Sequence, residues 1–133
     1  MLHEIVGLTD EPPAKRRWFH DEYFDLFVWQ TLNGELTRFQ LCYGIGGSER
    51  ALIWQSHGGF FHDGLAPGRV ESIEAVQARF ETAGPTLPKT IRQAVGARLR
   101  EFGKIAENVP VRRRTFRRAA WQKRLRPAEQ KAG

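Results

Sequence analysis

Residues 24–43 read F-D-L-F-V-W-Q-T-L-N-G-E-L-T-R-F-Q-L-C-Y, two runs rich in aromatic and apolar residues on either side of Asn33-Gly34. Such runs favour β-strands. Asn-Gly tolerates the positive φ angles that a two-residue hairpin turn requires. We therefore expect an antiparallel hairpin. A two-residue turn pairs Leu32 with Glu35, and the same register places Phe24 opposite Tyr43.

This register predicts which side chains share each face of the hairpin, because side chains alternate along a strand. One face, the predicted core face, carries only apolar or aromatic side chains over the paired region: Phe24, Leu26, Val28, Phe39, Leu41 and Tyr43. The opposite face, called the second face below, mixes polar and aromatic side chains: Asp25, Phe27, Trp29, Thr31, Leu36, Arg38, Gln40 and Cys42. We expect the core face to be covered by the rest of the chain.

The segments around the hairpin extend the predicted sheet. Residues 49–55 (E-R-A-L-I-W-Q) fit a third strand, with Ala51 and Ile53 on the core face and Arg50, Leu52 and Trp54 on the second face. Residues 60–63 fit a short fourth strand, which gives an antiparallel meander of three to four strands. The glycine-rich loop at 44–48 lacks a phosphate-binding motif. Residues 1–16 read as a flexible lead-in, in which Ile5, Val6 and Leu8 could form an edge strand before Pro12-Pro13.

The hydrophobic period changes to that of a helix after the strands. Val70, Ile73, Val76 and Phe80 predict one helix, which Gly84-Pro85 ends. Ile91, Val95, Leu99 and Phe102 predict a second helix, with Thr86 as a possible N-cap and Pro88 in its first turn. Gly96 in this helix suggests close packing. A third helix over residues 111–125 is possible, so two to three helices would pack on the sheet. We expect one α+β domain over residues 17–109.

The composition excludes several classes of protein. The chain has 133 residues, of which 41% are hydrophobic and 27% charged, as in ordinary globular proteins, so disorder as the main state is disfavoured. It contains no apolar run long enough for a transmembrane helix, and its start lacks the apolar core of a secretory signal. The single Cys42 cannot form an internal disulfide, which points to a reducing compartment. We expect a cytoplasmic protein.

The net charge of +6 is unevenly distributed. Residues 110–133 contain nine basic residues and Glu129, a net charge of +8, whereas residues 1–109 contain 12 basic and 14 acidic residues, a net charge of −2. Dense arginine with interleaved aromatics suits a nucleic acid or another polyanion, such as an acidic protein. The candidate contacts are Arg112, Arg113, Arg114, Arg117, Arg118, Trp121, Lys123, Arg124 and Arg126. The alternative is a solvated basic tail with incidental polyanion affinity.

Four sequence segments carry a resemblance to a family: W-F-H-D-E-Y-F-D-L-F-V-W at 18–29, F-Q-L-C-Y at 39–43, E-R-A-L-I-W at 49–54 and G-F-F-H at 59–62. In these segments the chain resembles a set of small, uncharacterised bacterial proteins. The resemblance implies a cytosolic bacterial protein. That family has no assigned activity, so the resemblance implies no catalytic residues.

The second face is the first candidate binding surface. Asp25, Trp29, Arg38, Gln40, Arg50 and Trp54 would share it and form an aromatic floor with a few polar groups, which suits a small ligand or a peptide. The alternative is that helices cover this face and that Asp25 pairs with Arg50 at its edge. Cys42 in the middle of a strand is expected to behave as a small apolar residue.

The tripeptide Phe-His-Asp occurs twice, at 19–21 and 61–63. If both copies met at one end of the sheet, His20, His62, Asp21 and Asp63 could bind a metal or transfer protons. The alternative is a pair of strand-end turns in which Asp binds nearby backbone. No strong metal-ligand spacing or catalytic motif occurs, so we predict no catalytic residue, metal or cofactor. A non-catalytic binding domain is therefore the first hypothesis, with polyanion binding through the tail and a His20/His62 site as alternatives.

Overall fold

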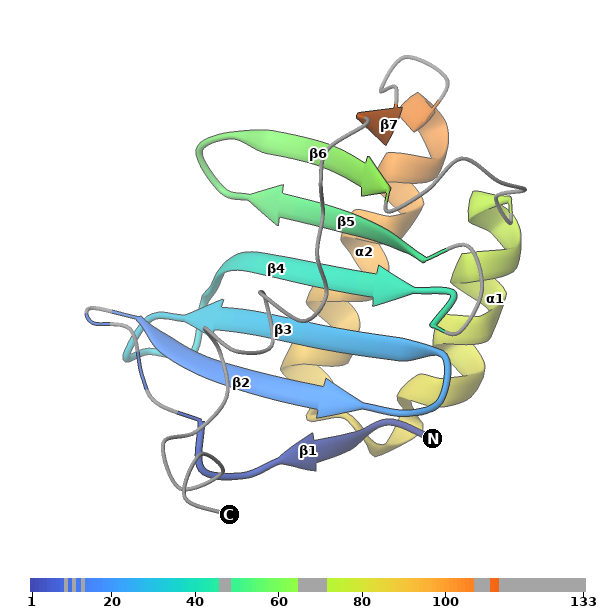
Figure 1. Cartoon of the computed structure of the whole chain (residues 1–133). Coiled ribbons are helices and arrows are strands. Elements are labelled where there is room, and N and C mark those ends of the chain that lie inside the picture. Colours follow the sequence, from blue (N-terminus) through green and yellow to red (C-terminus); the bar gives the residue numbers. More distant parts are fainter. Residues whose placement is uncertain are drawn as a thin grey trace.

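The computed structural model describes residues 1–8, 10, 12, 14–45, 49–64, 72–106 and 111–112. These residues form a sheet and a layer of two α-helices that lies against one face of it (Figure 1). The strands are β1 (His3–Ile5), β2 (Lys15–His20), β3 (Phe24–Gln30), β4 (Leu36–Tyr43), β5 (Arg50–Gln55), β6 (Gly59–Gly64) and β7 (Val111–Arg112). The helices are α1 (Ile73–Ala83), the short 3-10 helix η1 (Gly84–Thr86) and α2 (Lys89–Ile105).

The sheet follows the order of the chain. Strands β1 to β6 are antiparallel to their neighbours, and the two-residue β7 adds to β6 in parallel. The α+β prediction is confirmed, but the predicted three to four strands are too few, because the antiparallel part has six. The predicted lead-in over 1–16 contains β1 and the start of β2. The edge strand expected around Ile5, Val6 and Leu8 coincides with β1 only at Ile5, because His3–Ile5 pair with β2 and residues 6–8 are not in a strand.

The predicted register of the central hairpin is confirmed. Phe24 pairs with Tyr43, Leu26 with Leu41 and Val28 with Phe39. The predicted two-residue turn is wrong, because the register shifts by one residue between Trp29 and Gln30 and residues 31–35 connect the strands. Only Gly34 has a positive φ in this connection, at 87°, and its N–H donates to the carbonyl oxygen of Thr31. A three-residue or longer loop with one left-handed glycine needs no positive φ at Asn33.

The side chains of β5 lie on the opposite faces of the sheet from those predicted. Leu52 pairs with Leu41 and Trp54 with Phe39, so Arg50, Leu52 and Trp54 lie on the core face. Ala51 pairs with Cys42 and Ile53 with Gln40, which places both on the second face. Both phases of R-A-L-I-W contain apolar residues, and the long preceding loop does not fix the register. A shift of one residue exchanges the two faces of a strand.

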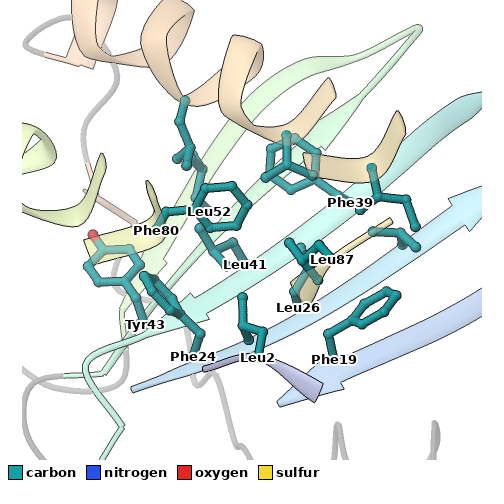
Figure 2. Close-up of a cluster of buried hydrophobic side chains, with 14 of the residues drawn as sticks. Leu2, Phe19, Phe24, Leu26, Phe39, Leu41, Tyr43, Leu52, Phe80 and Leu87 are labelled. Atoms are coloured by element: carbon teal, nitrogen blue, oxygen red, sulfur yellow. The ribbon is translucent and has the colours of Figure 1, made fainter. Parts of the chain in front are cut away.

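The main core lies between the core face of the sheet and the two helices. Figure 2 shows Phe24, Leu26, Phe39, Leu41 and Tyr43 of the strands gathered with Phe80 of α1 and with Leu87. Helix α2 contributes the four predicted residues Ile91, Val95, Leu99 and Phe102, all at most 1% exposed. Leu2 is also buried here, and its N–H donates to the carbonyl oxygen of Ala83. The core therefore joins the first residues of the chain to the helical layer.

The helix ends agree with the sequence only in part. Gly84 caps the C-terminus of α1, as predicted, and Ser72 caps its N-terminus by accepting from the N–H of Ala75. Thr86 is not the N-cap of α2, because it belongs to η1 and its hydroxyl donates to the carbonyl oxygen of Leu2. Pro88 occupies the cap position instead. Proline has no N–H to leave unpaired there.

The predicted third helix begins where the structure shows a strand, since Val111 and Arg112 form β7. The remaining residues of that prediction, 113–125, lie outside the described residues. Of the helices in the described part of the chain, none is long and apolar enough to cross a membrane.

Candidate functional site

The structure brings together four of the six candidate binding residues that were predicted to share the second face. The pairings of Asp25 with Cys42, of Trp29 with Arg38 and of Gln40 with Ile53 place Asp25, Trp29, Arg38 and Gln40 on the side of the sheet away from the helices. Arg50 and Trp54 lie on the core face, as described above. Trp18 of β2 pairs with Phe27 and joins the second face, and the sequence analysis did not include it.

The second face is packed rather than hollow. Asp25 is 1% exposed, Gln40 is 0% and Trp29 is 5%. The rings of Trp18 and Phe27 stack at 5.5 Å, and the guanidinium of Arg38 lies 4.4 Å from the centre of the Trp29 ring. Buried aromatic and cation–π contacts of this kind stabilise a fold. These residues therefore have little surface to offer a ligand.

Trp54 and Arg50 are buried on the core face instead. Trp54 stacks on Phe39 at 6.0 Å, and Arg98 of α2 lies 4.5 Å above its ring. Arg50 is 4% exposed and pairs across the strands with Tyr43. The predicted pairing of Asp25 with Arg50 at one edge is wrong, because the two side chains belong to opposite faces of the sheet.

The two Phe-His-Asp tripeptides do not converge. His20 shares a face with Asp25 and, through the cross-strand pairs, with Asp63. His62 precedes Asp63, so its side chain lies on the core face, where its ring meets Phe102 edge-on at 5.4 Å. Asp21 accepts hydrogen bonds from the N–H groups of Tyr23 and Phe24 and so forms the strand-end turn of the alternative prediction. A joint His20/His62 site is therefore excluded.

The described residues hold no group of three or more His, Cys, Asp or Glu side chains suited to a metal ion. They do hold one histidine–carboxylate pair. His20 Nδ1 lies 2.7 Å from Oδ1 of Asp25, and the same oxygen accepts a hydrogen bond from Nε1 of Trp18 at 2.7 Å. The sequence indicated the His20 position but not its partner, because Asp25 comes from the neighbouring strand.

Burial shifts the pKa of three other groups. It raises the pKa of the Cys42 thiol to about 12, so the protonated form dominates near neutral pH, as expected for a small apolar residue. It raises the pKa of Glu49 to about 7. Burial, with the charge of Arg50 nearby, lowers the pKa of His62 to about 4. His62 is therefore neutral at physiological pH and contacts the hydroxyl of Tyr43 at 2.5 Å.

Helix α2 carries an exposed positive surface that the sequence analysis missed. Lys89, Arg92, Arg100 and Lys104 are all exposed. At 100° per residue they fall within about 120° of the helix circumference. We call these four residues the basic face. The spacing of these cations along the chain, three, eight and four residues, is visible in the sequence. The sequence analysis considered only the C-terminal segment, where the positive charge is denser.

A shallow hollow of about 280 Å³ lies beside the basic face, between α1 and α2. Its lining is Phe80, Glu81, Arg92, Gln93, Gly96 and Arg100. There is room for a side chain at Gly96, where a Cβ atom would have Arg100 Nη1, at 3.5 Å, as its nearest neighbour. The lining of the hollow therefore includes two guanidinium groups and one carboxylate.

Comparisons of the chain with protein-family models, curated proteins and solved structures give no match. The resemblance to small bacterial proteins therefore stays a prediction. A functional proposal therefore has to rest on the chemistry of the described residues.

Proposed function

We propose that this protein is a non-catalytic binding protein whose partner is a nucleic acid, and that the basic face of α2 contacts the phosphate backbone. The observation that carries the proposal is the exposure of Lys89, Arg92, Arg100 and Lys104 on one side of a single helix. Arginine and lysine neutralise phosphates and release the counterions condensed on nucleic acid. Such binding needs charge and shape, without any catalytic group.

The geometry of α2 suits a backbone contact. At a rise of 1.5 Å per residue, Lys89 and Lys104 lie about 22 Å apart along the helix. The acidic residue of α2, Glu101, forms an ion pair with Arg98 at 2.7 Å, and both fall outside the basic face. The buried Ile91, Val95 and Leu99 anchor the helix, which fixes the backbone positions of the four cations.

This surface replaces the second face of the sheet as the favoured binding surface. Asp25, Trp29 and Gln40 are too deeply buried to contact a partner, whereas the four cations of α2 reach solvent. The basic C-terminal segment remains a candidate surface for the same partner. Apart from the strand residue Arg112, its candidate contacts lie outside the described residues, so an experiment must separate the two surfaces.

The test is a titration of fluorescent single- and double-stranded oligonucleotides with the full chain at several salt concentrations. Four phosphate contacts correspond to a slope of log K against log salt of about −3.6 for duplex DNA. Arg92→Ala/Arg100→Ala should make this slope shallower by about 2 and weaken binding at low salt. Lys15→Ala/Arg79→Ala removes the same charge from exposed residues outside the basic face and should retain the wild-type slope.

Two results would overturn the proposal. One is an equal loss of binding in the two double variants, which would mean that only net charge matters. The other is a wild-type slope in Arg92→Ala/Arg100→Ala together with loss of binding when Arg113, Arg114, Arg117 and Arg118 are changed to Gln. That second result would assign the nucleic-acid contact to the C-terminal segment.

A further inference from the structure

Two histidines face each other across the first two strands. His3 of β1 pairs directly with His20 of β2, so both side chains project from the same face of the sheet. Their ring centroids are 5.8 Å apart, with the ring planes at 85°. His3 is exposed, and the side chain of His20 is 37% exposed. Both imidazoles are therefore within reach of an ion from solvent.

Asp25 contacts the ring of His20 in a way that suits a metal ligand. It is 1% exposed and lies 2.7 Å from Nδ1 of His20 through Oδ1. If Asp25 is ionised, its carboxylate only accepts hydrogen bonds, so Nδ1 of His20 donates the proton and the lone pair of a neutral ring is on Nε2. Trp18 donates its indole N–H to the same oxygen and holds the carboxylate in place. Carboxylate–histidine pairs of this kind orient metal-bound histidines in proteins.

We propose that His3 and His20 bind a divalent late transition-metal ion of the Zn²⁺ and Cu²⁺ type. Neutral imidazole nitrogens suit these metals, whereas Mg²⁺ and Ca²⁺ require oxygen ligands. Zinc–nitrogen bonds are about 2.1 Å long, so one ion can lie between two rings whose centroids are 5.8 Å apart. Two protein ligands leave the remaining positions to water or to a small external ligand.

The other histidines and the cysteine lie apart from this pair or are buried. His62 is buried on the core face against Tyr43 and Phe102. Cys42 pairs with Asp25 on the second face, but it is 2% exposed and protonated. His57 is exposed in the turn between β5 and β6, apart from the histidine pair, and provides a matched control.

The site also has a structural consequence. Strand β1 is three residues long and forms the edge of the sheet. An ion bound to both histidines would connect it to β2. Ligands that bind only the folded state stabilise it in proportion to the logarithm of their concentration over Kd. Metal should therefore raise the melting temperature, and this effect gives a readout that needs no knowledge of the protein's partner.

The experiment uses the untagged full chain, titrated with ZnCl₂ and CuCl₂ in a calorimeter and followed by thermal unfolding. Wild type should bind one ion, with Cu²⁺ tighter than Zn²⁺, and MgCl₂ should have no effect. His3→Gln and His20→Gln should each abolish the rise in melting temperature, and His57→Gln should keep it. Asp25→Asn should weaken binding by about 10- to 100-fold.

The histidine variants decide the proposal even if Asp25→Asn fails to fold, because His3 and His20 both reach solvent. Metal binding that persists in both variants would place the ion elsewhere. No heat of binding by wild type at millimolar metal would show that the pair is not a site. Oligonucleotide binding by His3→Gln and His20→Gln should equal that of wild type. The metal proposal can therefore fail without affecting the proposed nucleic-acid function, and the reverse also holds.

Discussion

The phenol oxygen of Tyr43 lies 2.5 Å from Nε2 of His62, in the interior between the sheet and α2. Both residues are at most 5% exposed, and the ring of Phe102 meets the imidazole edge-on. A neutral imidazole can accept the hydrogen bond of the Tyr43 hydroxyl at Nε2. The low pKa of His62, about 4, keeps the imidazole uncharged near neutral pH and couples the stability of the fold to pH.

Acidification should destabilise the protein through His62. Its pKa is about 4 in the folded state and 6.5 in the unfolded chain, so the unfolded state binds the extra proton between these values. The contribution is unchanged above pH 6.5 and is lost as the pH falls towards 4. From pH 7 to pH 5 we expect a loss of about 2 kcal/mol.

The measurement is urea unfolding of wild type and His62→Gln at pH 7 and pH 5. The variant lacks the titrating group. The difference in unfolding free energy between the two proteins should therefore change by about 2 kcal/mol from pH 7 to pH 5. All other titrating groups are common to both proteins and cancel. A difference that stays constant across this pH range would show that His62 is not held neutral.

Glu49 should produce the opposite dependence. Burial raises its pKa from 4.5 to about 7, so the folded state retains a proton that the unfolded chain releases. Its contribution to stability is greatest below pH 4.5 and is lost as the pH rises to 7. Glu49→Gln keeps the neutral shape, so the variant should gain stability relative to wild type between pH 5 and pH 8. Urea unfolding at these two pH values tests the direction, and a relative loss would contradict it.

The Cys42 thiol should be unreactive in the folded protein. It is 2% exposed, and its pKa of about 12 leaves almost no thiolate at pH 8. A chromogenic disulfide reagent should label it slowly in buffer and at once in denaturing urea. Fast labelling of the folded protein, at the rate seen in urea, would show that the second face opens readily around this residue.

Leu52 provides a test of the observed phase of β5. It is 1% exposed on the core face, and Leu52→Ala should cost about 3 kcal/mol of unfolding free energy. Leu32 is 81% exposed in the hairpin connection, and Leu32→Ala, with the same chemical change, should cost less than about 0.5 kcal/mol. Equal costs in chemical denaturation would mean that Leu52 does not pack beneath the helices.

The central hairpin was the most predictable part of the fold, and β5 shows why other parts were less so. In residues 24–43 only one phase is uniformly apolar, so hydrophobic burial selects a single register. In β5 both phases are apolar, and the choice depends on pairing with Leu41 and Phe39 across a six-residue gap. Strand β1 has no pattern of its own and is selected by contacts with β2 and by burial of Leu2.

The contacts around His20 were less predictable than the fold because they join residues from different strands. His20 and Asp25 are five residues apart and meet only because β2 and β3 pair in the observed register. The contact between His3 and His20 depends on β1, and the sequence placed its possible edge strand later, at Ile5, Val6 and Leu8. The basic face of α2 was predictable from spacing alone, since its four cations come from one helix.

The two glycines of α2 should respond differently to alanine. The sequence suggested close packing at Gly96, but a Cβ there has room, whereas at Gly103 it would lie 2.6 Å from Nε2 of Gln77. That nitrogen donates to the carbonyl oxygen of Leu99 and would have to move away. Gly96→Ala should therefore stabilise the protein by up to about 1 kcal/mol through helix propensity.

Gly103→Ala gains the same propensity but loses the Gln77 hydrogen bond, which is worth about 1 kcal/mol. Its net effect should be near zero or destabilising. Urea unfolding of both variants gives the comparison, and Gln77→Ala serves as the control, because in that background the substitution at Gly103 no longer meets the amide. If Gly103→Ala stabilises the wild-type background as much as Gly96→Ala does, the close approach of α1 to α2 at Gln77 would be wrong.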